Sequence, residues 1–349
     1  MLYAKLSELP LEIEGYTLEP RRLATSSGWV RHTTVVRLSG RGFEGAGEDV
    51  IYEAANQIEL QEAGAYLQLS GRYTFDEYSR LLGRTDLFPD QPIAPTAPLF
   101  RRWAFESAAL DLALAQAGTS MAAVLGRSPK PTRYVVSLGL GDPASLAPIE
   151  GILRSYPRTR FKVDLAECWD EAFVRRLAET RAVDVVDLKG HYRGDFRGPA
   201  ADADQYRWVA EHLSEAWLED PCLEGDAAAA LHESRERITW DAVLHSAEDL
   251  LRLPFKPTCV NIKPSRFGSV AELMAVYEHC ERHGIRMYGG GQFELGPGRG
   301  QIQCLASLFH PDEPNDVAPC GFNARELPDG LADCPLSPDS FVGDGFRAS

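Results

Sequence analysis

The chain has 349 residues, of which 44% are hydrophobic and 25% charged, and it carries a formal net charge of −15. This composition is ordinary for a globular protein long enough for two domains, and its acidity argues against a nucleic-acid partner, because neutralising phosphates needs a basic face. The sequence contains no run of about 18 apolar residues, and its first residues lack a cationic region followed by an apolar core, so we expect no membrane partner, no signal peptide and a cytoplasmic location.

The seven cysteines are scattered along the chain, and no two of them form a CxxC pair. Their number is odd, so a complete set of disulfides within one chain is excluded. We therefore expect reduced thiols and no zinc ribbon.

Residues 1–98 are predicted to form a small α+β domain. Two segments, 11–24 and 29–40, have the composition of strands in an antiparallel sheet. The run RGFEGAGEDV (41–50) is predicted to be a glycine-rich turn that carries acids, and helices are expected near 52–68 and 74–82. A proline-rich connector, DLFPDQPIAPTAPLF (86–100), follows.

Residues 99–132 contain an alanine-rich helix that we interpret as the joint between two domains, with Gly118 as its expected end. From residue 133 to 322 strand-like and helix-like segments alternate. The predicted strands are 133–140, 160–165, 183–190, 215–220, 237–241, 258–263, 285–291 and 315–319. Eight strands with helices between them predict an α/β fold, a (β/α)8-type barrel. Residues 323–349 are predicted to be an irregular C-terminal segment.

Three predicted barrel strands, AWLED, ITWD and VNIK, end in a charged residue, and these residues are Glu219, Asp241 and Lys263. They are separated by equal intervals, each long enough for one strand, one helix and two loops. In a closed parallel barrel the carboxyl ends of the strands meet at one face, where the active site lies. We therefore expect the three side chains to converge.

Two further strands contribute pairs of charges, Lys162 with Asp164 and Asp187 with Lys189. Residues two apart on a strand face the same way, so each pair is expected to point into the mouth of the barrel. Carboxylates from neighbouring strands suit Mg²⁺, a hard ion that prefers oxygen ligands. The alternative for each single residue is an exposed charge just beyond its strand, although burying the whole ordered set without a function would be unfavourable.

Nearly the whole chain resembles the enolase superfamily, in particular its branch of muconate lactonizing enzyme and o-succinylbenzoate synthase. The motifs that carry the resemblance are GAGE (45–48), the alanine-rich helix, LEDP (218–221), SAEDLLRL (246–253), NIKPSRFGSVAE (261–272), YGGGQFELGPGRGQIQCLASL (288–308) and NDVAP (315–319). The resemblance implies an N-terminal α+β capping domain followed by a modified barrel.

Matched residue by residue, the resemblance implies that Asp187, Glu219 and Asp241 are the metal ligands and that Lys263 is the catalytic lysine. Asp164 is a rival for the first ligand, because DLAECWD (164–170) resembles the same motif. The separation of Asp164 from Glu219, however, leaves room for an additional strand and helix, which favours Asp187.

Lys162 matches the first lysine of the family's Lys-x-Lys pair, so we include it among the catalytic residues. Asp164 stands where the second lysine is usual, and it is a candidate base or a partner of a neighbouring cation. Lys189 and Ala242 also depart from the usual Asp-x-Asn and Asp-Glu pairs. These departures bear on the reaction more than on the fold.

Three further residues are candidates for substrate binding: Lys189, Gly291 and Glu294. The amides of the glycine-rich run around Gly291 are suited to contact an anionic group, and Glu294 is expected to line the pocket. The competing interpretations are that the glycines turn the backbone and that Glu294 lies on a solvated loop.

The resemblance implies an enzyme, a metal-dependent lyase or isomerase that uses Mg²⁺, with Mn²⁺ as a substitute. The expected reaction is abstraction of a proton α to a substrate carboxylate through an enediolate, giving elimination or cycloisomerisation. The first alternative is a racemase or epimerase of an amino acid derivative, and the second is a non-catalytic binding protein that kept the barrel. The expected partner is a small-molecule carboxylate, and a homo-oligomer is compatible with the resemblance.

Overall fold

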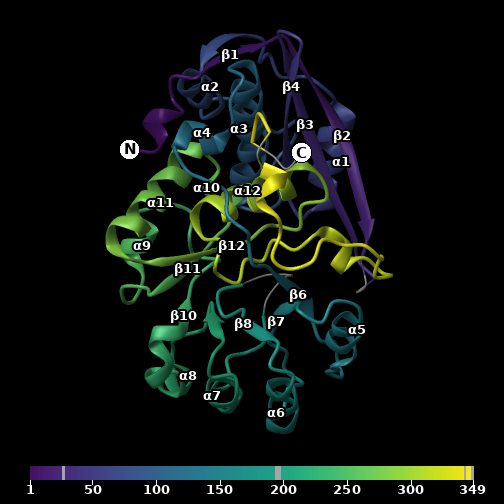
Figure 1. Cartoon of the computed structure of the whole chain (residues 1–349), viewed down its shortest axis with the longest axis vertical. Helices are drawn as coiled ribbons and strands as arrows, with labels where there is room; N and C mark the ends of the chain where they lie inside the picture. The colour runs from purple at the N-terminus through teal and green to yellow at the C-terminus, as the bar shows by residue number, and fades with distance from the viewer. Residues whose placement is uncertain (26–27, 193–197, 342, 347–349) are drawn as a thin grey trace.

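The computed structural model describes residues 1–25, 28–192, 198–341 and 343–346 (Figure 1). Antiparallel strands and helices from the N-terminal part of the chain form one end of the molecule, and a region of parallel strands with outer helices forms the other. This arrangement confirms the predicted α/β class, a (β/α)8-type barrel with an N-terminal α+β capping domain.

The capping domain is built on a three-stranded antiparallel sheet with the order β2-β3-β4. Its elements are β1 (Pro10–Ile13), β2 (Gly15–Ala24), β3 (Val30–Gly40), β4 (Phe43–Asp49), α1 (Ala54–Ala63), β5 (Gly71–Thr74) and α2 (Phe75–Leu82). The segment 11–24, predicted as one strand, is two strands, because β1 leaves the main sheet to pair with β5. Helix α2 begins at a capping box, in which Thr74 and Glu77 each accept the other's backbone N–H.

The GAGE motif lies in a strand, so the predicted turn over residues 41–50 is wrong for most of its length. Only Arg41 and Gly42 turn the chain, and β4 then pairs with β3 along its whole length. The glycines are needed for packing, because α3 (Ala97–Gln116) lies directly on β4. A Cβ atom at Gly45 would lie 2.2 Å from the backbone nitrogen of Leu112, and one at Gly47 would lie 2.0 Å from the carbonyl oxygen of Ala104.

Seven barrel strands are present in the described residues, and their bounds are β6 (Val135–Gly139), β7 (Arg160–Asp164), β8 (Val183–Asp187), β9 (Trp217–Glu219), β10 (Ile238–Thr239), β11 (Cys259–Ile262) and β12 (Arg286–Gly289). Strands β6 to β10 form one parallel sheet in sequence order, and β11 pairs with β12. A backbone hydrogen bond of 2.9 Å from Asn261 to Trp240 joins the two groups.

The predicted eighth strand, residues 315–319, is reduced to two isolated bridges. Asn315 pairs with Tyr134 beside β6, and Asp316 pairs with Gly290 beside β12, so these two residues close the barrel. Pro314 and Pro319 flank the segment, and a proline has no N–H to donate to a ladder. The pairing is therefore too short to count as a strand.

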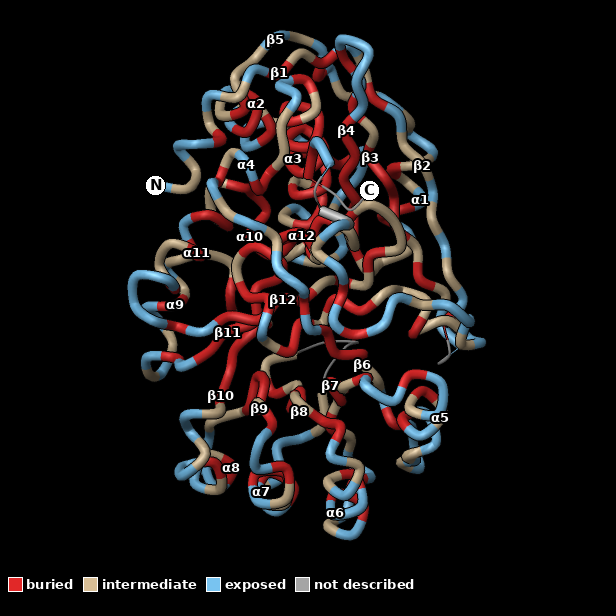
Figure 2. Tube along the Cα trace, in the orientation of Figure 1, coloured by how far each residue is buried: buried red, intermediate tan, exposed pale blue. Residues whose placement is uncertain are grey.

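The helices of the barrel region lie outside its strands, except α10, whose four residues are all buried (Figures 1 and 2). They are α5 (Ala147–Ser155), α6 (Glu171–Glu179), α7 (Ala203–His212), α8 (Gly225–Ala230), α9 (Asp249–Arg252), α10 (Pro264–Phe267), α11 (Val270–His283) and α12 (Pro297–Phe309), and α4 (Met121–Leu125) follows the linker helix α3. Helix α10, a single turn directly after Lys263, was not predicted. None of the helices in the described residues combines the length and apolar character needed to cross a bilayer.

The C-terminal segment returns from the barrel to the linker helix. Its residue Leu336 pairs with Thr132, and Gly345 pairs with Ser120. Phe346 is fully buried against Trp103 of α3, with the two ring centroids 6.4 Å apart. The segment therefore fastens the two parts of the molecule together.

The close contact between α3 and β4 predicts that Gly47→Ala destabilises the protein, because the added methyl group meets backbone that cannot move independently. We expect the free energy of unfolding, measured by urea denaturation, to fall by about 1–3 kcal/mol. Gly15→Ala is the matched control, since Gly15 lies in the same sheet and a Cβ atom there has no neighbour within 4 Å. Equal stability of the two variants would contradict this account of the motif.

Candidate active site

The ends of three neighbouring barrel strands carry carboxylates at the same level. Asp164 ends β7, Asp187 ends β8 and Glu219 ends β9, and in the register Asp164 faces Asp187 and Asp187 faces Glu219. The predicted convergence of these side chains at the carboxyl ends of the strands therefore follows from the in-register pairing of β7, β8 and β9.

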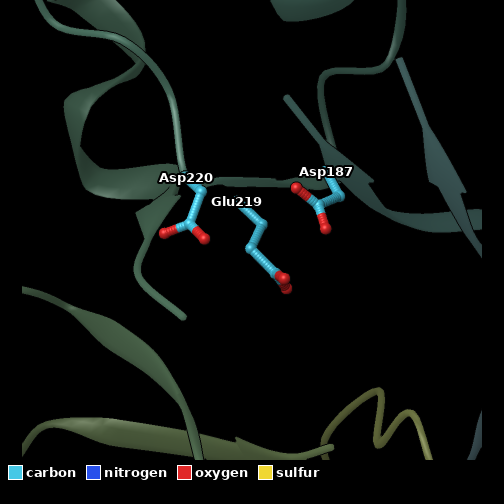
Figure 3. A group of neighbouring side chains, drawn as sticks. All are labelled: Asp187, Glu219 and Asp220. Atoms are coloured by element: carbon cyan, nitrogen blue, oxygen red, sulfur yellow. The ribbon is translucent and has the colours of Figure 1, made fainter. Parts of the chain in front are cut away.

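Asp187, Glu219 and Asp220 form a compact group (Figure 3). Each offers one carboxylate oxygen, these oxygens lie within 4.8 Å of one another, and all three residues are buried. Consecutive side chains on a regular strand point to opposite faces. Asp220 nevertheless reaches the same group as Glu219, because it leaves the strand geometry with a left-handed φ of 49°.

Two lysines pair with this group. The buried ammonium group of Lys162 forms an ion pair with Glu219 and lies 3.6 Å from Oδ2 of Asp187. The ammonium group of Lys189 lies 2.5 Å from Oδ2 of Asp187 and 3.1 Å from Oδ1 of Asp164. Asp164 is thus the partner of a neighbouring cation, one of the two roles expected for it.

Asp241 and Lys263 meet beside this group. The amine of Lys263, which follows β11, lies 2.7 Å from Oδ2 of Asp241. The guanidinium of Arg266 lies 3.1 Å from Oδ1 of the same carboxylate, and Tyr192 donates a hydrogen bond of 3.1 Å to Oδ2. Burial alone would raise the pKa of Asp241, but Arg266 and Lys263 outweigh burial and lower that pKa.

Asp220 connects the two clusters through the backbone. Its two carboxylate oxygens accept the N–H groups of Asp241 (2.9 Å) and Ala242 (2.8 Å). The carboxylate therefore holds the turn after β10 in place, and with it the side chain of Asp241. The sequence offers a signal for this role, because Asp220 directly follows Glu219 in LEDP at the end of the strand.

Glu219 receives two hydrogen bonds that were not predicted. Tyr288 of β12 donates its hydroxyl to the carboxylate, and the Asn261 amide of β11 donates to Oε2 at 3.2 Å. Asn261 lies two residues before Lys263, so the two-residue period of a strand was a usable signal for it. Tyr288 had no such signal, because its strand pairs with β11 only in the folded barrel.

The residues present fit a divalent cation. Burial raises the pKa of Glu219 to about 7, against the opposing effect of Lys162. Burial, reinforced by Asp241 and Asp187, raises the pKa of Asp220 to about 8. Buried carboxylate oxygens that repel one another in this way are stabilised by a hard cation such as Mg²⁺.

Gly291 and Glu294 lie together at the loop after β12. A Cβ atom at Gly291 would lie 2.1 Å from Oε2 of Glu294, so a larger residue there would displace this carboxylate. Glu294 is buried, and its other oxygen accepts the N–H of Gln292 at 2.7 Å. The expectation of a solvated loop does not apply to Glu294, while contact of these residues with a substrate stays a prediction.

The nine predicted site residues thus fall into three adjoining groups. The first contains Lys162, Asp164, Asp187, Lys189 and Glu219, the second Asp241 and Lys263, and the third Gly291 and Glu294. Asn261 lies between the first group and the loop after β12, since its amide nitrogen bonds Glu219 and its amide oxygen would lie 2.7 Å from a Cβ atom at Gly290. The individual roles assigned to these residues remain predictions.

Two family models together match most of the chain. A model described as the C-terminal domain of DUF8230, a domain of unknown function, matches residues 128–324, and the corresponding N-terminal domain matches residues 4–124.

Relatives found by sequence are enzymes. The chain is 27% identical over 357 residues to an N-succinylamino acid racemase of Thermus thermophilus, a match that covers 95% of this chain and 90% of the relative. It is 27% identical over 254 residues to an o-succinylbenzoate synthase of Bacillus subtilis, covering 69% of this chain and 63% of the relative.

Solved structures share the fold. A member of the enolase superfamily from Listeria innocua superposes with a TM-score of 0.64 at 17% identity, covering 88% of this chain and 86% of the other. A dipeptide epimerase from Methylococcus capsulatus, determined in complex with Mg, gives a TM-score of 0.62 at 21% identity and covers 90% of this chain and 88% of the other.

These comparisons confirm the predicted kind of protein, an enzyme related to racemases and o-succinylbenzoate synthases. The chain belongs to the DUF8230 family, and its fold is shared by members of the enolase superfamily.

Proposed function

We propose that the protein removes a proton α to the carboxylate of a small-molecule substrate, with Lys263 as the base and Mg²⁺ as the cofactor. The observation that carries the proposal is the buried lysine amine beside strand-end carboxylates, with Lys263 bound to Asp241 and next to the group of Asp187, Glu219 and Asp220. Such a proton is very weakly acidic, so its removal needs both a base and stabilisation of the charge that appears on the carboxylate oxygens.

Asp187 and Glu219 would hold the metal, with Asp241 as the third ligand. Asp220 is the alternative third ligand, because its oxygen belongs to the group within 4.8 Å. Bound Mg²⁺ supplies positive charge opposite the developing negative charge of the substrate. The pairing of Lys162 with Glu219 and of Lys189 with Asp187 compensates the same carboxylates within the chain itself.

Side chains of the protein would orient the base and attract the substrate. Arg266 and Tyr192 fix Asp241, and Asp241 in turn orients the amine of Lys263. Lys162 and Lys189 provide positive charge that attracts a carboxylate substrate. Gly291 and Glu294 lie on the loop beside Lys263 and are our candidates for contacts with the rest of the substrate.

The arrangement favours a reaction with one base, an elimination or a cycloisomerisation. Asp164, the candidate for a base on the opposite face, is paired with Lys189 at 3.1 Å. A base on one face is enough to remove a proton and expel or attach a group on the same side. Names of relatives such as o-succinylbenzoate synthase are consistent with this class.

Racemisation or epimerisation is the second candidate, and one observation favours it. The relative matched over 95% of this chain is an N-succinylamino acid racemase. Racemisation requires a second group that returns the proton to the other face, and that group would be Asp164 or a lysine beside it.

Removing the proposed base should abolish exchange of the substrate's α-proton. We expect Lys263→Ala to lower the rate of deuterium wash-in from D₂O, measured by NMR over a panel of N-acylamino acids and other carboxylates, by about 10²–10⁴-fold. Lys256→Ala is the control, because Lys256 is exposed and bonds only a backbone carbonyl of His283 among the described residues. Unchanged wash-in in Lys263→Ala would exclude Lys263 as the base, and no wash-in for the wild type with any carboxylate would favour the binding-protein alternative.

Removing a metal ligand should weaken Mg²⁺ or Mn²⁺ binding. We expect Asp187→Asn and Glu219→Gln to raise the dissociation constant, measured by isothermal titration calorimetry, at least about tenfold. Asp184→Asn is a matched control on the same strand, since Asp184 pairs with Arg133 and Arg160 outside the cluster. Comparison of Asp241→Asn with Asp220→Asn then identifies the third ligand, and equal binding by all variants would refute the site.

The number of bases determines which enantiomers exchange. For a chiral substrate with one α-proton, a single base predicts deuterium wash-in from one enantiomer only. NMR and chiral chromatography measure this wash-in. Wash-in from both enantiomers with their interconversion would instead establish the racemase. In that case Asp164→Asn should lower the rate of exchange from one enantiomer about 10²-fold and leave the rate from the other enantiomer unchanged.

A further inference from the structure

Two charged side chains of the capping domain form hydrogen bonds with the backbone of the loop after β12. We define this mouth loop as residues 290–298, between β12 and the first turn of α12. The two side chains are Arg31 of β3 and Glu48 of β4, and both are buried, with 0% and 1% of their surface exposed.

Arg31 binds the carbonyl groups of the mouth loop. Its guanidinium donates to the carbonyl oxygens of Gln292 (2.7 Å) and Phe293 (3.2 Å). The same group donates to the carbonyl oxygens of Val50 (2.6 Å) and Ile51 (2.8 Å) in the capping domain. One planar cation therefore joins the backbones of both domains, a geometry that the five donors of arginine allow and that lysine cannot reproduce.

Glu48 binds the N–H groups that follow. Its carboxylate accepts from Leu295 (2.6 Å), Gly296 (2.9 Å) and Gly298 (3.1 Å). These N–H groups precede or begin α12, where a helix leaves its N–H groups unpaired and favours a negative charge. Thr33 of β3 donates its hydroxyl to the same carboxylate at 2.7 Å and fixes its orientation.

The mouth loop in turn packs against Lys263. The N–H of Gly290 donates to the carbonyl of Ile262 at 3.0 Å. A Cβ atom at Gly290 would lie 2.9 Å from Cε of Lys263, so the loop backbone forms a wall along the lysine side chain. A shift of the loop would therefore change the position of the amine.

We propose that Arg31 and Glu48 are positioning residues. Arg31 binds carbonyl groups of the mouth loop, Glu48 binds its N–H groups, and the loop held in this way sets the position of the Lys263 amine. The inference rests on the proposed function of Lys263 and extends it to the capping domain. The domain thus takes part in the chemistry through backbone contacts, although neither side chain is bonded to a strand-end carboxylate within the described residues.

Two other buried charges of the same region provide matched controls. Arg101 of α3 is also fully buried, but it bonds Asp49 (2.8 Å) and the carbonyl of Asn56 (2.8 Å), and within the described residues no hydrogen bond joins it to the mouth loop. Glu106 of α3 is fully buried and accepts the N–H of Val270 (2.9 Å) at the start of α11, away from the loop. We expect both control substitutions to destabilise the fold without removing a hydrogen bond to the mouth loop.

The first readout does not need turnover. We expect hydrogen–deuterium exchange of the peptide covering residues 290–298, measured by mass spectrometry, to become about tenfold faster or more in Arg31→Lys and Glu48→Gln. In Arg101→Lys and Glu106→Gln it should stay as in the wild type. Labelling of Lys263 by an amine-directed acylating reagent should change in the first pair only, and unaltered exchange and labelling there would overturn the proposal.

The second readout separates positioning from stability. Under conditions in which all variants are folded, we expect kcat for α-proton exchange to fall about tenfold or more in Arg31→Lys and Glu48→Gln, while KM changes far less. The controls should lower Tm but keep kcat. Equal kcat in all four variants would show that Arg31 and Glu48 have a structural role only and would contradict the proposal. Absence of exchange in the wild type would defeat the proposed function alone, because the first readout still decides whether the loop and Lys263 are held from the capping domain.

Discussion

Compensation of buried negative charge is the constraint on which the rest of the structure depends. Asp187, Glu219, Asp220 and Asp241 are all inaccessible to solvent, and an isolated carboxylate in such a place would be strongly unfavourable. Each is balanced in its own way. Lys162 and Lys189 neutralise the first two, two backbone N–H groups satisfy Asp220, and Arg266 with Lys263 surrounds Asp241. These partners come from β7, from the turns after β8 and β10, and from the residues after β11, so the part of the barrel from β7 to β11 must be assembled before the charges are balanced.

The capping domain depends on a different kind of contact, close approach of backbone to backbone. Gly45 and Gly47 let the linker helix α3 lie on β4, and this places Glu48 at the edge where the domain meets the barrel. Glu48 and Arg31 bond backbone groups of the mouth loop across that edge, so these bonds hold the path of the loop without a partner side chain in it. Side chains contribute as well, because the ring centroid of Phe293 in the loop lies 6.2 Å from that of Trp29.

Residues that alternate along a strand could be predicted from the sequence, and residues brought together by the closed fold could not. The charges at 219, 241 and 263 are equally spaced, and those at 162, 164 and 187 lie at the ends of predicted strands, so their common face could be predicted from the strand–helix alternation. The GAGE stretch was misinterpreted because glycines favour turns in general, whereas here they admit a helix. The eighth strand was predicted to be longer than it is, because the composition of NDVAP does not reveal how few of its N–H groups have a hydrogen-bond partner. Tyr288, Arg31 and Glu48 act across domains or strands far apart in the chain, and no local pattern announces such partners.

The burial of Phe346 has a consequence for the order in which the molecule is made. Asp111 of α3 accepts the N–H of Ala46 with one carboxylate oxygen and the N–H of Phe346, 235 positions downstream, with the other. Domains generally fold from the N-terminus during synthesis, so the linker helix and its sheet emerge from the ribosome long before this partner does. Until then Asp111 and Trp103 lack their contacts with Phe346. The linker helix therefore gains part of its packing only after the whole barrel, which lies between these residues in the chain, has been synthesised.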